Sequence, residues 1–492
     1  KLKLFSNNTL LNWGVVLNVL GLLSAINGLF MLLCIPVSII YGEPVIYAFI
    51  KSGLVCFGLG SILLFITRKH QKVIKKREGY LIVTLGWLML AFTGSLPYFI
   101  SGYIPLFTDA FFETISGYTT TGATILNEIE TLPKSILFWR SITHWIGGMG
   151  IIVLTIAILP ILGIGGMQLF VAESPGPSAD KLHPRIKETA KRLWAIYVLL
   201  TGLQTVLLIV GGMTIFDAIN HAMSTVSTGG FSTKNASIAH YESLYIHWII
   251  TIFMFIAGVN FTVTYFALKG NFKRLVNNEE FKYYALAAIG SSLMVSVLIY
   301  TLNDYSISSA ITEGFFMVLA IGTTTGFVTA DYTTWTPVVT VIFFWLMFMG
   351  ASAGSTSGGV KVVRHLVILK NSILELKKLI HPSAIIPVKL NNKAVSNDIV
   401  FNVLSFFLLY LIIFIFGAVF MASLGLDFKT AIGASIACIG NIGPGLGDVG
   451  PVHSYASIPS VGKWFLSFLM LLGRLELFTV LVLLTPFFWK KS

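Results

Sequence analysis

The chain has 492 residues, of which 55% are hydrophobic and only 11% are charged, and its formal net charge is +12. A soluble protein carries about a quarter charged residues, so this composition excludes a cytosolic enzyme and a disordered or fibrous chain. Long continuous apolar runs also exclude an outer-membrane barrel, whose strands alternate polar and apolar residues. We therefore predict an all-α polytopic membrane protein.

Ten apolar runs are long enough to cross a hydrocarbon layer about 30 Å thick. They lie near residues 13–40, 45–67, 80–101, 138–160, 193–212, 246–268, 283–302, 337–360, 398–424 and 462–488. The first run lacks a small-residue cleavage site and is expected to be a retained span.

Basic residues gather in alternate connections between these runs, as in 68–77, 181–192 and 361–378. The positive-inside rule places these connections and both termini in the cytoplasm. The net charge is therefore mainly an orientation signal, with membrane lipid as a contact and no nucleic acid as a partner.

The outer segments form a repeated pattern. Each contains a stretch of 10 to 13 mostly apolar residues, too short to cross, followed by Thr, Ser and Gly. The glycines Gly122, Gly229, Gly326 and Gly443 recur about every 100 residues, which indicates internal repeats. We predict an N-terminal transmembrane hairpin (1–76) and four tandem helix–pore-loop–helix repeats (77–172, 173–270, 271–380 and 381–492) around a pseudo-fourfold pore.

These outer motifs have the chemistry of a cation filter. Glycine lets successive backbone carbonyls turn inward and surround a dehydrated monovalent cation, and the C-terminal ends of the short helices favour positive charge. In the fourth motif we expect carbonyls, rather than side chains, to be the ligands. The predicted filter residues are Thr120, Thr121, Gly122, Ser227, Thr228, Gly229, Thr324, Thr325, Gly326, Asn441, Ile442 and Gly443.

Two features interrupt the later spans and are candidates for a gate. The eighth run contains a segment too rich in Gly and Ser for a stable helix, although a small-residue packing face is an alternative. This segment is Gly350, Ala351, Ser352, Ala353, Gly354, Ser355, Thr356, Ser357, Gly358 and Gly359. In the tenth run, Arg474 is expected near the bilayer centre and facing the pore or a partner, while Glu476 points elsewhere on the helix.

Enzyme signatures are weak. The segment 445–450 fits GxGxxG and 350–354 fits GxSxG, but neither has the strand and helix setting that these motifs need. Cysteine and histidine show no metal-ligand spacing. We predict no catalytic residues and no bound cofactor.

The motifs resemble the Trk/Ktr/HKT superfamily of potassium transporters, and the extra N-terminal hairpin resembles its TrkH branch. The resemblance is carried by YTTTGAT at 118–124, STGGF at 227–231, TTTGF at 323–327 and GNIGPGLG at 440–447. The segments HWIGGMG at 144–150 and GASAGSTSGGVK at 350–361 support it.

This resemblance implies gated potassium uptake across the bacterial inner (plasma) membrane, with K⁺ as the transported ion bound at the filter residues. It also implies a homodimer with one pore per protomer and a cytosolic TrkA-like nucleotide-binding regulatory ring, which we expect to dock on 173–192 and 361–382. A cation-coupled K⁺ or Na⁺ secondary transporter with alternating access is the alternative, and a membrane enzyme is the third.

Overall fold

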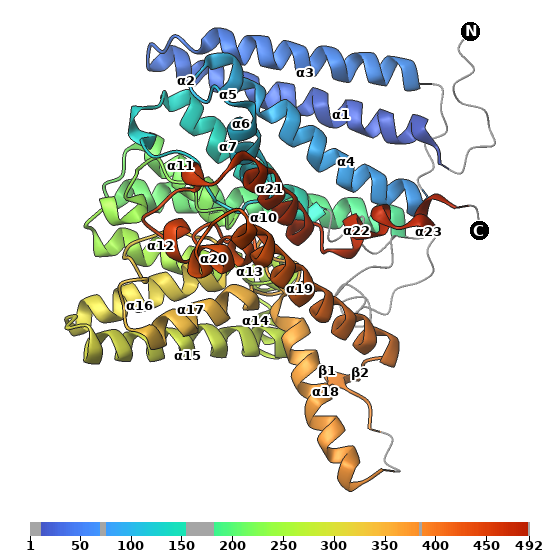
Figure 1. The fold of residues 1–492 in the computed structure, drawn as a ribbon, viewed down its shortest axis with the longest axis vertical. Coiled ribbons are helices and arrows are strands. Elements are labelled where there is room, and N and C mark those ends of the chain that lie inside the picture. Colours follow the sequence, from blue (N-terminus) through green and yellow to red (C-terminus); the bar gives the residue numbers. More distant parts are fainter. Residues whose placement is uncertain (1–10, 69–74, 154–181, 383–385, 491–492) are drawn as a thin grey trace.

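The computed structural model describes residues 11–68, 75–153, 182–382 and 386–490. In these residues the chain folds as a helical bundle from which helix α18 projects (Figure 1). The described part holds one small sheet, in which β1 (Lys389–Leu390) pairs antiparallel with β2 (Lys393–Ala394). The predicted all-α polytopic fold is confirmed.

The longer helices correspond to the predicted spans. They are α1 (Trp13–Leu32), α3 (Ile46–Thr67), α4 (Lys76–Gly94), α7 (Lys134–Val153), α10 (Leu182–Val210), α12 (Leu244–Ala257), α15 (Glu279–Leu302), α17 (Pro337–Met349), α19 (Asn397–Ser423) and α21 (Ser460–Arg474). Other helices extend or connect them: α2 (Cys34–Ile40), α5 (Leu96–Ser101), α13 (Phe261–Leu268), α14 (Phe272–Val276), α18 (Val362–Ile380), α22 (Phe478–Leu481) and α23 (Pro486–Trp489).

Three predicted spans are not continuous helices. Among the described residues, six helices are long and apolar enough to cross a membrane, or eight if two bent pairs each count as one span. Helices α12 and α13 meet at 109°, and α21 turns by 112° into the segment that starts with α22. The eighth run stops being helical at Met349, where the Gly/Ser segment begins. The end of the predicted span 138–160 and the predicted repeat boundary at 172/173 lie outside the described residues.

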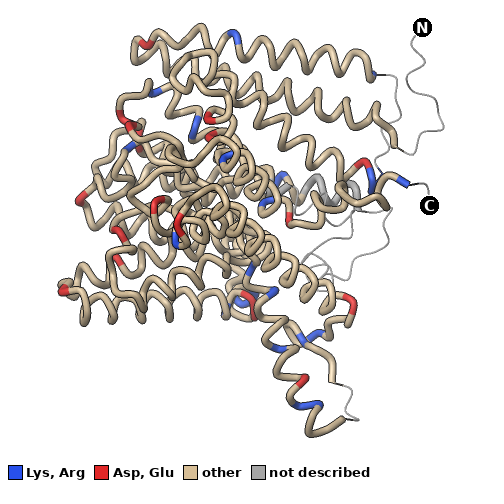
Figure 2. Tube along the Cα trace, in the orientation of Figure 1, with Lys and Arg blue, Asp and Glu red and all other residues tan. Residues whose placement is uncertain are grey.

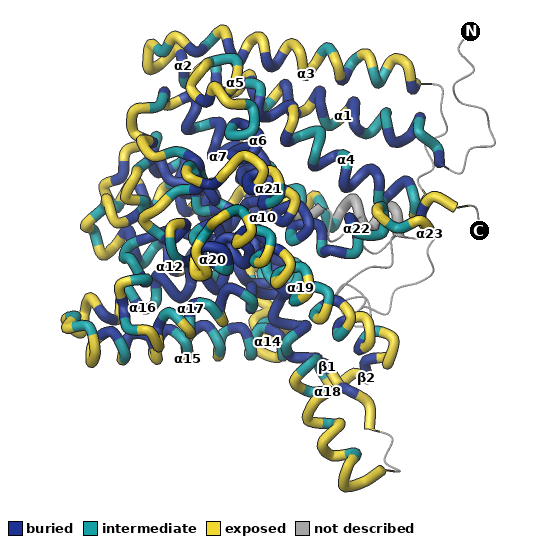
Figure 3. Tube along the Cα trace, in the orientation of Figure 1, coloured by how far each residue is buried: buried dark blue, intermediate teal, exposed yellow. Residues whose placement is uncertain are grey.

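Four short helices converge on the centre of the bundle, where their C-terminal halves are mostly buried, whereas the first residues of α11, α16 and α20 are exposed. These pore helices are α6 (Phe107–Tyr118), α11 (Ile215–Val226), α16 (Ile307–Gly322) and α20 (Phe428–Ile439). Three of their N-termini have a capping side chain: Thr214 accepts a hydrogen bond from the Asp217 amide, Ser306 from the Ser309 amide, and Asp427 from the Lys429 and Thr430 amides. Leu106, which precedes α6, provides no such cap. In Figure 3 buried segments dominate the centre, whereas outer helices such as α3 and α15 expose many residues.

The pore helices are arranged as a closed ring. Each packs against the two spans of its own repeat and against the second span of the repeat before it. Thus α6 contacts α21, α11 contacts α7, α16 contacts α12, and α20 contacts α17. Four repeats that pack in a cyclic order enclose a common axis, as predicted from the period in the sequence.

The N-terminal hairpin packs on the outside of this ring. Helices α1 and α3 approach closely at small residues: a Cβ added to Gly28 would lie 2.8 Å from the Gly53 carbonyl oxygen. Close backbone approach of this kind is typical of helix pairs in membranes. Figure 2 shows how few charged residues lie along these helices, whereas α18 carries Arg364, Lys370 and two further lysines.

Candidate functional site

The four pore helices end in the same strained turn. The second residue beyond each helix has a left-handed backbone, with φ of 50° at Thr120, 55° at Thr228, 59° at Thr324 and 53° at Asn441. The turn satisfies helix carbonyls, as when the Thr120 amide donates to Gly117 and the Thr121 amide to Ser116. Threonine rarely adopts this backbone, and each instance costs about 1–3 kcal/mol. Strain repeated at equivalent positions of all four repeats marks a functional segment.

A glycine with positive φ follows two residues later in every repeat. The values are 82° at Gly122, 81° at Gly230, 76° at Gly326 and 93° at Gly443. Alternation of left-handed and right-handed residues turns successive carbonyls toward one side, whereas in a regular strand they alternate. This is the backbone arrangement that a carbonyl-lined filter requires.

The four segments touch one another in cyclic order. A Cβ on Gly122 would collide with the carbonyl oxygen of Gly229, one on Gly230 with that of Thr325, and one on Gly326 with that of Ile442. The ring closes because a Cβ on Gly443 would lie 2.7 Å from the Thr121 carbonyl oxygen. At these four positions the neighbouring backbone leaves no space for a side chain.

The structure changes the predicted register in the second repeat by one residue. The left-handed glycine is Gly230, whereas Gly229 corresponds to Thr121, and Ser227 corresponds to Thr119 rather than to Thr120. The prediction chose the first of two adjacent glycines, and only the backbone angles distinguish them. In the other three repeats the predicted residues occupy equivalent positions.

A polar cavity of about 180 Å³ lies directly outside this ring. Its wall includes all four left-handed glycines, together with residues of the outer loops such as Asn127, Lys234 and His453. The ring therefore has an outer vestibule.

The Asn441 side chain is a structural link. Its Nδ2 donates to Thr121 Oγ1 at 3.0 Å and to the Met470 carbonyl at 2.8 Å. These bonds tie the fourth segment to the first and to α21. Asparagine therefore stands where the other repeats have threonine because its longer side chain reaches both neighbours.

The Gly/Ser segment 350–359 lies against the inner ends of three pore helices. Thr356 Oγ1 donates to the Val226 carbonyl at 3.1 Å, the Gly358 amide to Thr324 Oγ1 at 2.7 Å, and the Gly359 amide to the Gly440 carbonyl at 3.0 Å. Backbone bonds with the break between α12 and α13 complete the anchoring, since the Ser352 amide donates to the Gly258 carbonyl and the Phe261 amide to the Gly354 carbonyl. This loop, here called the inner loop, is thus hydrogen-bonded to the ring itself.

The structure brings Arg474 and the inner loop together. Arg474 is 2% exposed, and its guanidinium donates to the Thr356 carbonyl at 2.7 Å and to the Gly147 carbonyl of α7 at 3.2 Å. However, Arg474 ends a helix instead of lying within a continuous span. Glu476 also has a partner that the sequence does not indicate, because it accepts from Arg364 at 2.5 Å.

Comparison with known proteins agrees with this geometry. The TrkH family model, described as a cation transport protein, matches residues 46–290 and 292–491. The chain belongs to the TrkH family. Over 485 residues it is 42% identical to the Trk system potassium uptake protein TrkH of Salmonella typhimurium and 41% identical to that of Escherichia coli, covering 98% of this chain and 100% of each relative.

A solved structure extends the match to three dimensions. The crystal structure of the potassium transporter TrkH from Vibrio parahaemolyticus superimposes with a TM-score of 0.90 at 38% identity, and the match covers 98% of this chain and 100% of that one. This TrkH-family chain therefore has a transporter's fold, as predicted, and its relatives are named as transporters rather than enzymes.

Proposed function

We propose that this protein carries K⁺ into the cell through a channel-like selectivity filter. The single observation that carries the proposal is the closed ring of four backbone segments, each with a left-handed Thr or Asn followed by a left-handed glycine. The relatives' names specify potassium uptake, which supports K⁺ as the transported ion.

The filter would select by carbonyl geometry. Carbonyls of the segments 120–122, 228–230, 324–326 and 441–443 replace water around the ion, and the C-terminal ends of the pore helices add a favourable partial negative charge. The absence of a ring of carboxylates in these four segments supports backbone coordination over side-chain charge.

The inner loop and Arg474 form the gate in this proposal. The loop closes the inner mouth while its amides are bonded to Thr324 and Gly440, and Arg474 holds it to α7. A buried cation at this point also opposes the passage of another cation. Because the inner loop leads directly into α18, a regulator that moves α18 would pull on the gate.

The proposed setting is the bacterial inner membrane, with both termini in the cytoplasm. Basic connections such as 361–378 support this orientation. We further propose a homodimer controlled by a cytosolic TrkA-like nucleotide-binding ring that docks on 361–382. Of the other expected docking segment, 173–192, residues up to 181 lie outside the described part of the chain.

Flux into liposomes tests the proposed function. Purified protein is reconstituted, and influx is measured under matched inward gradients of K⁺ or Na⁺, with empty liposomes as the control. We expect influx of K⁺ well above that of Na⁺. Equal influx of both ions, or influx no greater than in empty liposomes, would refute a K⁺ filter.

A further inference from the structure

We propose that the buried ion pair between Glu113 and Arg140 positions the outer part of the filter and thereby sets the discrimination between K⁺ and Na⁺. This inference rests on the proposed function, because it concerns the same filter. Glu113 and Arg140 are treated as positioning residues, since they act on the ion through the backbone segments that follow Gly122 and Gly230.

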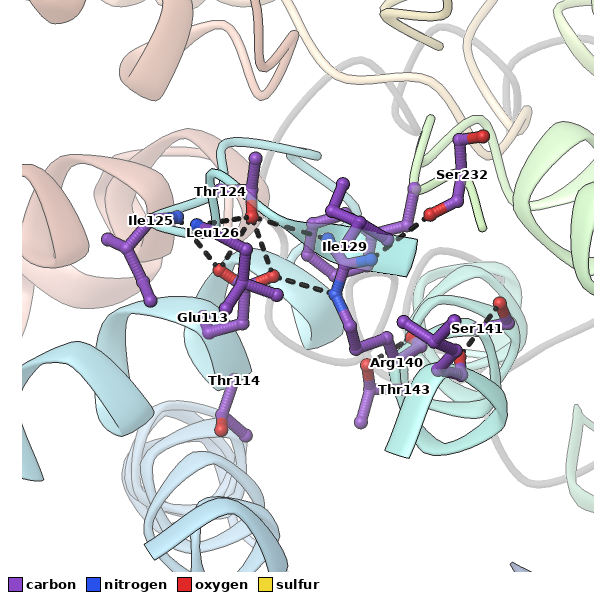
Figure 4. A network of polar contacts seen from close by, with 12 residues as sticks. Glu113, Thr114, Thr124, Ile125, Leu126, Ile129, Arg140, Ser141, Thr143 and Ser232 are labelled. Atoms are coloured by element: carbon purple, nitrogen blue, oxygen red, sulfur yellow. Dashed lines mark hydrogen bonds and ion pairs between the residues drawn. The ribbon is translucent and has the colours of Figure 1, made fainter. Parts of the chain in front are cut away.

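The pair is wholly enclosed by protein. Glu113 lies on α6 and Arg140 on α7, and their side chains are 0% and 1% exposed. Arg140 Nε donates to Glu113 Oε1 at 2.8 Å (Figure 4). Removing two charges from water is expensive, so a buried pair requires further hydrogen bonds to satisfy its remaining atoms.

Glu113 accepts its further hydrogen bonds from the segment that follows Gly122 in the sequence. Thr124 Oγ1 lies 3.0 Å from each carboxylate oxygen, and the Ile125 amide donates to Oε2 at 3.0 Å. Two residues beyond the filter glycine, the chain is therefore fixed by a charge-assisted contact, which is stronger than a bond between neutral groups.

Arg140 reaches the neighbouring repeat. Its NH1 donates to the Ser232 carbonyl at 3.1 Å, its NH2 to Thr124 Oγ1 at 3.3 Å, and its guanidinium lies 4.1 Å from the centre of the Phe231 ring. Figure 4 shows Arg140 between Glu113 and Ser232. One ion pair thus holds the segment after Gly122 and the segment after Gly230 at a fixed separation.

The other repeats fix the equivalent segments with different chemistry. The residue nine positions before the left-handed glycine is Glu113, His221, Met317 and Ala434 in turn. His221 Nε2 is hydrogen-bonded to Ser232 Oγ at 2.9 Å, and Met317 Sδ accepts from the Thr329 amide at 3.4 Å.

The fourth repeat has no such side chain. There the hydroxyl of Tyr332, from the third repeat, donates to the Gly445 carbonyl at 2.6 Å. Carboxylates also reach the equivalent segments of the second and third repeats, where Thr233 Oγ1 donates to Asp217 and Thr329 Oγ1 donates to Glu313. Among the ion pairs of the described residues, however, Glu113–Arg140 alone holds two such segments together. We therefore expect the junction between the first two repeats to contribute strongly to the filter's resistance to adjusting around a smaller ion.

The effect on permeation distinguishes this positioning role from that of a charged cation-binding site. Because Arg140 compensates the carboxylate, the pair fixes geometry without adding net charge beside the ion path. Its loss should therefore change the ratio of K⁺ to Na⁺ permeability, rather than simply reduce the attraction of cations.

The test uses the full chain in liposomes and measures the K⁺/Na⁺ permeability ratio from reversal potentials, together with the unfolding temperature. Glu113→Gln should lower the ratio about tenfold, comparable to the loss of one charge-assisted hydrogen bond. Thr124→Val keeps the ion pair but removes the hydroxyl, and should lower the ratio about threefold. Thr124→Ser restores the hydroxyl and should keep the wild-type ratio.

Glu279→Gln is the matched control. It breaks the part-exposed pair with Lys370, 2.5 Å apart, which contacts neither the filter nor the inner loop. This variant should keep the wild-type ratio.

Thr124→Val decides the outcome if Glu113→Gln does not fold. A wild-type ratio in folded Thr124→Val protein would overturn the inference while leaving the proposed function intact, as would lower flux with an unchanged ratio. An unselective wild-type protein would instead overturn the proposed function, and the inference with it.

Discussion

Replacement of Gly122 by serine tests the filter most sharply at a single position. Gly122 has φ of 82°, and a Cβ there would collide with the Gly229 carbonyl oxygen. A left-handed backbone costs a non-glycine residue about 1–2 kcal/mol. If the ring relieves this cost by moving the carbonyl, the preference for K⁺ over Na⁺ should fall by a similar free energy, equivalent to about five- to thirtyfold in the permeability ratio.

The chain offers a matched control for backbone strain. Gly102 also has positive φ, 78°, but no atom lies within 4 Å of where its Cβ would be. Gly102→Ser should therefore lose similar stability while keeping the wild-type permeability ratio. Both variants are measured by reversal potential in liposomes containing K⁺ on one side and Na⁺ on the other. An unchanged ratio in folded Gly122→Ser protein would refute the role of this glycine.

Two further predictions concern the gate and its surroundings. Arg474→Ala removes the donor that holds Thr356 to α7, so K⁺ flux into liposomes should rise; unchanged flux in folded protein would count against a gating role for Arg474. Glu476→Gln leaves Arg364 buried without its counter-ion and should lower the free energy of unfolding by about 3 kcal/mol, measured by chemical denaturation. Glu375→Gln, which breaks an exposed pair with Lys378, should change it by less than about 1 kcal/mol, and an equal effect of both variants would contradict the reasoning.

Repetition made much of the fold predictable from the sequence. A Gly/Thr motif recurring at similar spacing predicts four equivalent pore loops, and the structure places their helices in a closed ring. Composition alone was sufficient to predict that the inner loop is not helical, because a run of Gly and Ser does not favour continuation of the helix that ends at Met349.

The breaks within the spanning helices were harder to predict from the sequence than the repeats. The bend before α13 has a recognisable signal, since Asn260 caps the new helix by accepting from the Thr262 and Val263 amides. The bend after Arg474 is less clearly marked, because Gly473 lies within α21 and the turning residues Leu475, Glu476 and Leu477 include neither glycine nor proline. Its two left-handed residues, Glu476 and Leu477, adopt that backbone in a tertiary setting that includes the pair with Arg364.

Long-range pairing was the part that the sequence did not reveal. Arg364 and Glu476 are 112 residues apart, and Arg140 reaches the Ser232 carbonyl 92 residues away. Local periodicity carries no information about such contacts. The choice between Gly229 and Gly230 likewise depends on the backbone angles, which two adjacent glycines leave open.

Single-channel recording from the purified full chain in a planar bilayer tests the central claim most directly. With K⁺, Na⁺, Rb⁺ and Cs⁺ supplied in turn, a carbonyl-lined filter predicts discrete unitary currents that are larger for K⁺ than for Na⁺. Slow, saturable K⁺ flux without unitary events would contradict a continuous pore and favour alternating access instead.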